Sequence, residues 1–140
     1  ALLRTKQAFP DFFVAVWCFG PFRPRVAEYL RDGADVVMVE RYVDGATPAE
    51  FQYHFQGAIN VAREAGIIHK TVIALGINDA VMSDDEAKKH PWANTPEELE
   101  AQMRWIRENA PEMPGIAFFA PGSSPEMRKL ADKLAGELWK

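Results

Sequence analysis

Apolar residues in this chain gather into four short runs, each followed by a stretch with helical spacing. In the longest stretch Phe51, Phe55, Ile59 and Ala62 recur every three or four positions, which predicts a helix with one buried face. Strands that alternate with helices in this way indicate βαβ units, right-handed crossovers and a parallel sheet. The sequence therefore predicts an α/β fold with four strands, at Phe12–Trp17, Asp35–Tyr42, Lys70–Ile77 and Gly115–Ala120.

Two of the predicted helices begin with the same device. The segments at Thr47-Pro48-Ala49-Glu50 and Thr95-Pro96-Glu97-Glu98 both place threonine at the N-cap, proline at the first helical position and glutamate at N3. A glutamate at N3 can accept a hydrogen bond from the backbone N–H of the N-cap residue, which forms a capping box. We expect the first of these helices to end at Gly66 and the second to run to about Asn109.

The remaining segments carry weaker signals. A short helix is expected over Arg25–Arg31, closed by Gly33 in the left-handed conformation, and a last helix from Ser124 through Leu138. Residues 1–8 have helix-forming composition and look like the tail of a helix that begins upstream. The long charged segment 78–94 is expected either to be a loop over a site or to hold a short helical turn.

Two architectures fit four βα units: half of a (β/α)8 TIM barrel, or a small doubly wound, flavodoxin-like sheet. The half-barrel is favoured because no glycine-rich phosphate loop follows any predicted strand. It is also favoured by small residues at one parity of the strands, which suit a crowded barrel interior: Ala15, Ala74, Gly76 and Ala117. We therefore expect residues 1–140 to form a single (βα)4 unit, the C-terminal half of a larger barrel domain. Such a unit should associate with the missing N-terminal half or form a homodimer, because closure hides its edges.

Composition narrows the function classes. With 48% hydrophobic and 26% charged residues, the 140-residue chain is typical of a globular domain with one core. The net charge of −4 is spread without a basic stripe, so no nucleic-acid partner is expected. The single cysteine, Cys18, and three histidines without metal-ligand spacing predict no disulfide, metal or cofactor. No apolar run is long enough to span a membrane, and only a signal peptide on the parent protein would make it secreted or periplasmic.

The second predicted strand ends in ionisable and aromatic side chains, and it supplies the first candidate for function. In parallel α/β folds the carboxyl ends of the strands hold the ligand, and Glu40 lies at such an end. Alternation along the strands brings four further side chains towards the same mouth, namely Trp17, Tyr42, Asn78 and Phe119. The alternative role for Glu40 is an ion pair with a neighbouring arginine or lysine.

Several segments together resemble the C-terminal half of bacterial glycoside-hydrolase-like TIM-barrel proteins. They are VVMVERYV, KTVIALGIND, EELEAQMRWIRENAPEMPGIAFF and ADKLAGELW. The resemblance covers most of the chain, but it lies in the strands and connecting helices and includes no paired-acid signature of a defined family. It implies a carbohydrate-active barrel that acts on an oligo- or polysaccharide through carboxylate acid/base chemistry.

Glycoside hydrolysis uses two carboxyl groups that flank the scissile bond. Glu40 would supply one, and Asp79 or Asp44 the second, unless that group lies in the missing half. Aromatic side chains pack against the C–H faces of sugars, so the predicted substrate contacts are Trp17, Tyr42, Asn78, Phe119 and Trp92. Simpler roles are open for two of these residues, since Asp79 can start a turn and Trp92 can anchor its loop.

A half-barrel that binds sugar without hydrolysing it, or that is purely structural and assembles with a second chain, is the alternative to an enzyme. A second carboxylate at glycosidase distance from Glu40 would distinguish the enzyme from the binding module.

Overall fold

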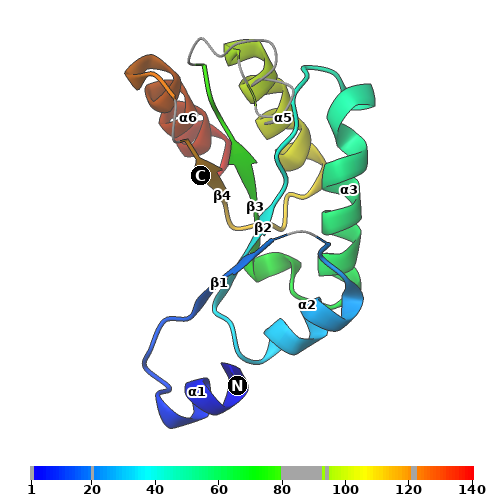
Figure 1. The fold of residues 1–140 in the computed structure, drawn as a ribbon, viewed down its shortest axis with the longest axis vertical. Helices are drawn as coiled ribbons and strands as arrows, with labels where there is room; N and C mark the ends of the chain where they lie inside the picture. The colour runs from blue at the N-terminus through cyan, green and yellow to red at the C-terminus, as the bar shows by residue number, and fades with distance from the viewer. Residues whose placement is uncertain (1, 20, 80–92, 94, 121–122) are drawn as a thin grey trace.

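The described residues form a four-stranded parallel sheet in which neighbouring strands are also consecutive in sequence (Figure 1). The structure is a computed structural model that describes residues 2–19, 21–79, 93, 95–120 and 123–140. The sheet order is β1-β2-β3-β4, and each adjacent pair is parallel. The predicted α/β class is confirmed, with strands β1 (Ala15–Cys18), β2 (Val36–Glu40), β3 (Thr71–Gly76) and β4 (Ile116–Phe119).

Helices connect the strands, and both predicted capping boxes form. At the first, Glu50 Oε2 accepts a hydrogen bond from Thr47 N at 2.9 Å. At the second, Thr95 Oγ1 accepts from Glu98 N at 3.2 Å, and the glutamate accepts from Thr95 N at 3.1 Å. The described helices are α1 (Leu2–Ala8), α2 (Pro24–Arg31), α3 (Pro48–Glu64), the 3-10 turn η1 (Ile68–Lys70), α5 (Pro96–Asn109) and α6 (Pro125–Leu138).

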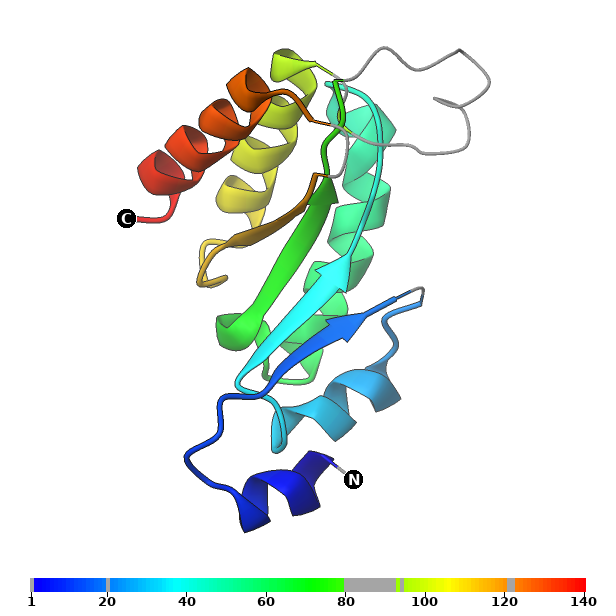
Figure 2. The ribbon, with the colours of Figure 1, turned by 60° about the vertical axis from the view of Figure 1, so that its left-hand side comes forward.

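One face of the sheet packs against the helices. Val37, Val39, Ile73 and Leu75 are fully buried there, in two hydrophobic clusters that take their other members from the helices and the segments beside them. Figure 2 shows α3 and α5 behind the strands. The register places alternate residues on the opposite face, which we call the open face: Ala15, Trp17, Val36, Met38, Glu40, Val72, Ala74, Gly76, Ala117 and Phe119.

The strand order favours the half-barrel over the doubly wound sheet. A flavodoxin-like sheet has the order 2-1-3-4-5, reverses at a switch point and carries helices on both faces. Here the order runs without reversal, and both hydrophobic clusters draw on the same face. The small residues predicted to line a barrel interior share the open face, where Ala74 lies beside Glu40 and Ala117.

The first strand begins later than predicted, at Ala15 instead of Phe12. The carboxylate of Asp35 accepts a hydrogen bond from Val14 N at 2.7 Å and pairs with Lys6 Nζ at 2.7 Å. These contacts tie the segment before the strand to α1 and to the start of β2, so Phe12 and Phe13 stay outside the sheet. Their side chains are 60% and 73% exposed.

The predicted left-handed stop at Gly33 is wrong. Among the described glycines a positive φ occurs at Gly45 and Gly66, and the latter, at 71°, closes α3 as predicted. Gly33 has a different role, because a Cβ there would lie 3.0 Å from Leu2 Cβ. A side chain at this position would therefore push α1 away from the end of α2.

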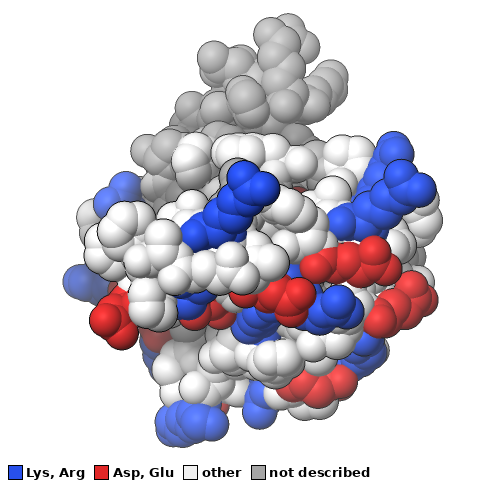
Figure 3. Space-filling model, turned by 90° about the horizontal axis from the view of Figure 1, so that it is seen from below, with Lys and Arg blue, Asp and Glu red and all other residues white. Residues whose placement is uncertain are grey.

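The described surface mixes charges of both signs. Figure 3 shows basic and acidic side chains interspersed with uncharged ones on the face seen from below. Among the described helices, none combines the length and the apolar character that crossing a bilayer requires.

Candidate functional site

Three predicted site residues come together on the open face where β2 and β4 end. Glu40 is partly exposed at the last position of β2, and Tyr42 follows two residues later. The ring of Tyr42 stacks on Phe119 of β4, with centroids 5.6 Å apart and planes 12° from parallel. Burial, together with the hydrogen bond and negative charge of Glu40, raises the pKa of Tyr42. The carboxylate therefore lies beside a phenol that keeps its proton at neutral pH.

Trp17 lies on the same face at the other edge of the sheet. It is in register with Met38, and its ring lies 6.1 Å from that of Phe19. The indole Nε1 is buried and has no hydrogen-bond partner among the described residues. Phe19 is 74% exposed and was not predicted as a site residue, although alternation from Trp17 would have identified it.

Asp79 ties the end of β3 to the start of α6. Its Oδ1 accepts from Ser124 N at 2.6 Å and its Oδ2 accepts from the Ser124 hydroxyl. Burial opposes ionisation of this carboxyl, but the two Ser124 hydrogen bonds prevail and lower its pKa. Both oxygens are engaged in a long-range structural contact, which favours a structural role for Asp79 over a catalytic one.

The other predicted residues are Asn78, Asp44 and Trp92. Asn78 lies at the same strand end as this cluster, since it follows by two positions Gly76, which is in register with Phe119. The backbone N of Asn78, which is 3% exposed, donates to Ala93 O at 3.0 Å, so the residue is part of the structure around β3. Asp44 is exposed in the loop between β2 and α3. Trp92 falls outside the described residues.

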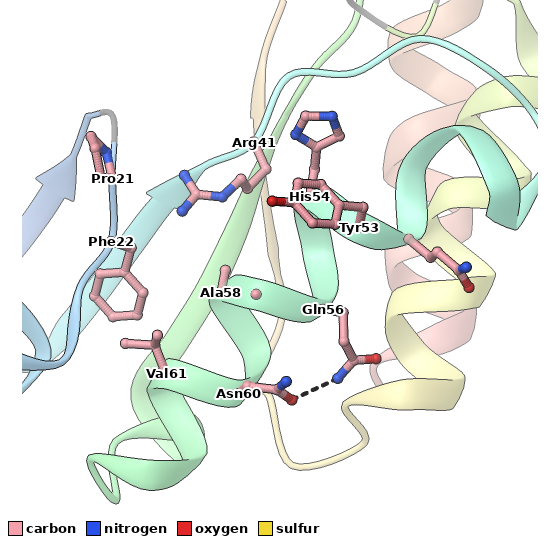
Figure 4. Close-up of a pocket in the computed structure, with 11 residues that line it drawn as sticks. Pro21, Phe22, Arg41, Tyr53, His54, Gln56, Ala58, Asn60 and Val61 are labelled. Carbon is pink, nitrogen blue, oxygen red and sulfur yellow. Dashed lines mark hydrogen bonds between the residues drawn. The ribbon is translucent and has the colours of Figure 1, made fainter.

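A hollow lies on the helix side of the sheet, and sequence reasoning did not identify it. We call it the helix-side groove; it has a volume of about 920 Å³. Arg41 points into it from the end of β2 (Figure 4). Its remaining walls are the segment before α2 and the surface of α3: Pro21, Phe22, Gln52, Tyr53, His54, Gln56, Gly57, Ala58, Asn60 and Val61.

The part of the chain that the structure describes gives little support for a cysteine nucleophile or a metal site. Burial raises the pKa of the Cys18 thiol, although the Arg41 guanidinium partly offsets this. Within the described residues, no three His, Cys, Asp or Glu side chains gather where they could hold a metal ion.

Comparison with known proteins gives no relative. No protein-family model, curated protein or solved structure matches this chain. The resemblance to glycoside-hydrolase-like barrels stays a prediction.

Proposed function

We propose that this chain is half of a carbohydrate-active barrel acting on an oligo- or polysaccharide. Glu40 is its acid/base or nucleophilic carboxylate, and the aromatic side chains of the open face hold the sugar. The observation that carries the proposal is the cluster of Glu40, Tyr42 and Phe119 at the carboxyl ends of parallel strands. A carboxylate beside flat aromatic rings suits a ligand with hydroxyl groups and apolar C–H faces.

The neighbours of Glu40 suit a proton-transfer role. Since the pKa of Tyr42 is raised, its phenol stays neutral and can donate to a carboxylate or to a sugar hydroxyl. Trp17 offers an aromatic ring at the other side of the face. Because Asp79 is engaged by Ser124, the second carboxylate that hydrolysis needs would be Asp44 or would come from the unit that completes the barrel.

Completion of the barrel is part of the proposal. Strands β1 and β4 are the two edges of the sheet, and the open face between them exposes Phe119 by 41%. Unpaired strand edges beside an apolar surface are association sites. A second four-stranded unit, either another copy or a separate half, would cover both. If a second copy completes the barrel, sedimentation at micromolar concentration should show a dimer. A stable monomer that binds no partner would contradict closure of the barrel.

A sugar-binding half-barrel without hydrolytic activity is the second candidate. The engagement of Asp79 favours it, because that contact removes one of the two carboxylates, Asp79 and Asp44, that were predicted to act with Glu40. The two candidates differ in turnover and agree in ligand class.

The test uses the full chain against a panel of oligosaccharides. Glu40→Gln should lower hydrolysis by about a hundredfold or more with unchanged unfolding, because general acid/base groups contribute on that scale. Glu64→Gln, at an exposed position of α3, is the matched control and should keep full activity. Binding without turnover in the wild type would select the second candidate.

Trp17→Ala tests the sugar surface itself. It should weaken binding in a fluorescence titration, while Tyr53→Ala, which removes an aromatic ring 83% exposed on α3, should not. Wild-type affinity in Trp17→Ala with loss in Tyr53→Ala would move the sugar to the helix side and overturn the proposal.

A further inference from the structure

The helix-side groove is separate from the open face, although its cation is the chain neighbour of Glu40. Successive residues at a strand end point to opposite faces. Glu40 thus belongs to the open face, while Arg41 reaches towards α3 and the segment before α2 (Figure 4). A ligand in the groove would meet none of the sugar-site residues.

The charge of the groove has one sign. Among the described residues that line the groove, Arg41 is a cation and none is an Asp or Glu. Its Nη1 donates to Glu40 O at 2.5 Å, which holds the guanidinium in place. Burial lowers the pKa of Arg41, because removal of a cation from water is costly. An anion next to the guanidinium would offset that cost and gain charge-assisted hydrogen bonds.

Neutral polar groups and an apolar floor complete the groove. Gln56 Nε2 donates to Asn60 Oδ1 at 2.7 Å, so the amide NH2 of Asn60 remains a donor. The apolar floor is formed by Phe22 and Ala58, whose exposed fractions are 6% and 1%, with Val61 also in the lining. A Cβ added at Gly57 would meet no atom within 4 Å, which leaves room over α3.

We infer that the helix-side groove binds a small organic anion, with a carboxylate or phosphate group against Arg41 and an apolar or aromatic body against Phe22 and Ala58. Its volume of about 920 Å³ lies within the range of about 300–1,000 Å³ that small-molecule sites occupy. This site goes beyond the proposed sugar chemistry and does not depend on it.

The probes are benzoate, phenyl phosphate and benzamide, which has the size of benzoate but no charge. Each is titrated at millimolar concentration into the full isotope-labelled chain, and binding is followed by NMR. The two anions should shift signals of α3 and of the segment before α2, and benzamide should bind at least about tenfold more weakly. The stronger of the two anions identifies the headgroup.

Two variants and a control make the result decisive. Arg41→Gln removes the charge, and Gly57→Leu fills the space; each should weaken anion binding by about tenfold or more. Gly136→Leu is the matched control, since Gly136 is likewise an exposed helical glycine with no atom within 4 Å of an added Cβ. Binding by neither anion, equal binding of benzamide, or unchanged binding in Gly57→Leu would overturn the inference. Since Gly57→Leu leaves Arg41 in place, the test holds even if Arg41→Gln does not fold.

Discussion

The contact between Asp79 and Ser124 should be a cooperative unit that holds α6 to the sheet. Asp79 accepts from both the backbone N and the hydroxyl of Ser124. The same hydroxyl oxygen accepts from Met127 N at 3.1 Å and so caps α6. Asp79→Ala removes both of these bonds, whereas Ser124→Ala removes the hydroxyl bond and the cap but keeps the backbone N–H. A double variant tests whether the two residues act together.

The expected cost follows from these bonds. Hydrogen bonds to a charged group contribute about 1.5–3 kcal/mol each when sheltered, and an N-cap about 1 kcal/mol. Solvent screens this partly exposed carboxylate, so we expect about 2 kcal/mol for either single variant. Because both variants lose the bond between Asp79 and the Ser124 hydroxyl, the double variant should lose about 3 kcal/mol, a coupling of about 1 kcal/mol. In a domain near this size each single loss lowers Tm by about 4–8 °C.

Urea unfolding followed by circular dichroism measures these values. Asp132→Ala is the control, because Asp132 is an exposed carboxylate on the same helix and should change stability by less than about 0.5 kcal/mol. Strict additivity of the two substitutions would refute the reasoning, since it would mean that they share no interaction.

The same pair predicts a pH dependence. The folded pKa of Asp79 is lowered, so its contribution is fully present above the unfolded value of about 3.9 and is lost as the pH falls through the folded pKa. The stability difference between wild type and Asp79→Ala should therefore shrink below about pH 4. A difference that stays constant from neutral pH to acid would contradict the assignment of an ionised carboxylate.

Two further substitutions probe the loop that follows β2. Gln102 is fully buried and its Nε2 donates to Val43 O at 3.1 Å and Gly45 O at 3.0 Å, so Gln102→Ala should cost about 2–4 kcal/mol and speed hydrogen exchange in this loop. Unchanged exchange would show that the glutamine does not hold the loop. Gly45→Ala should cost more than about 1 kcal/mol, because φ is 97° and the new Cβ would lie 2.6 Å from Glu50 Cβ. Gly136→Ala should instead stabilise the folded chain by about 0.4–1 kcal/mol. Thermal unfolding measures both glycine variants, and a loss of stability in both would point to a cause other than backbone strain.

Local patterns were enough to predict most of the fold. The Thr-Pro-x-Glu starts at Thr47 and Thr95 predicted two helix ends, because a capping box forms between residues three apart. Alternation along β2 assigned Glu40 and Met38 to one face, and the sheet register agrees. The role of Glu40 as a catalytic group stays a prediction, since placement on a face does not define a reaction.

Other features were decided by contacts between distant parts of the chain. The start of β1 depends on Asp35, which binds Lys6 and Val14. The state of Asp79 depends on Ser124, 45 residues away. Neither periodicity nor turn preference could predict these pairs of residues, because they meet only after the βα units have packed. The helix-side groove has the same origin: Arg41, the segment before α2 and the surface of α3 become neighbours through parallel strand pairing and the helix crossover that it requires.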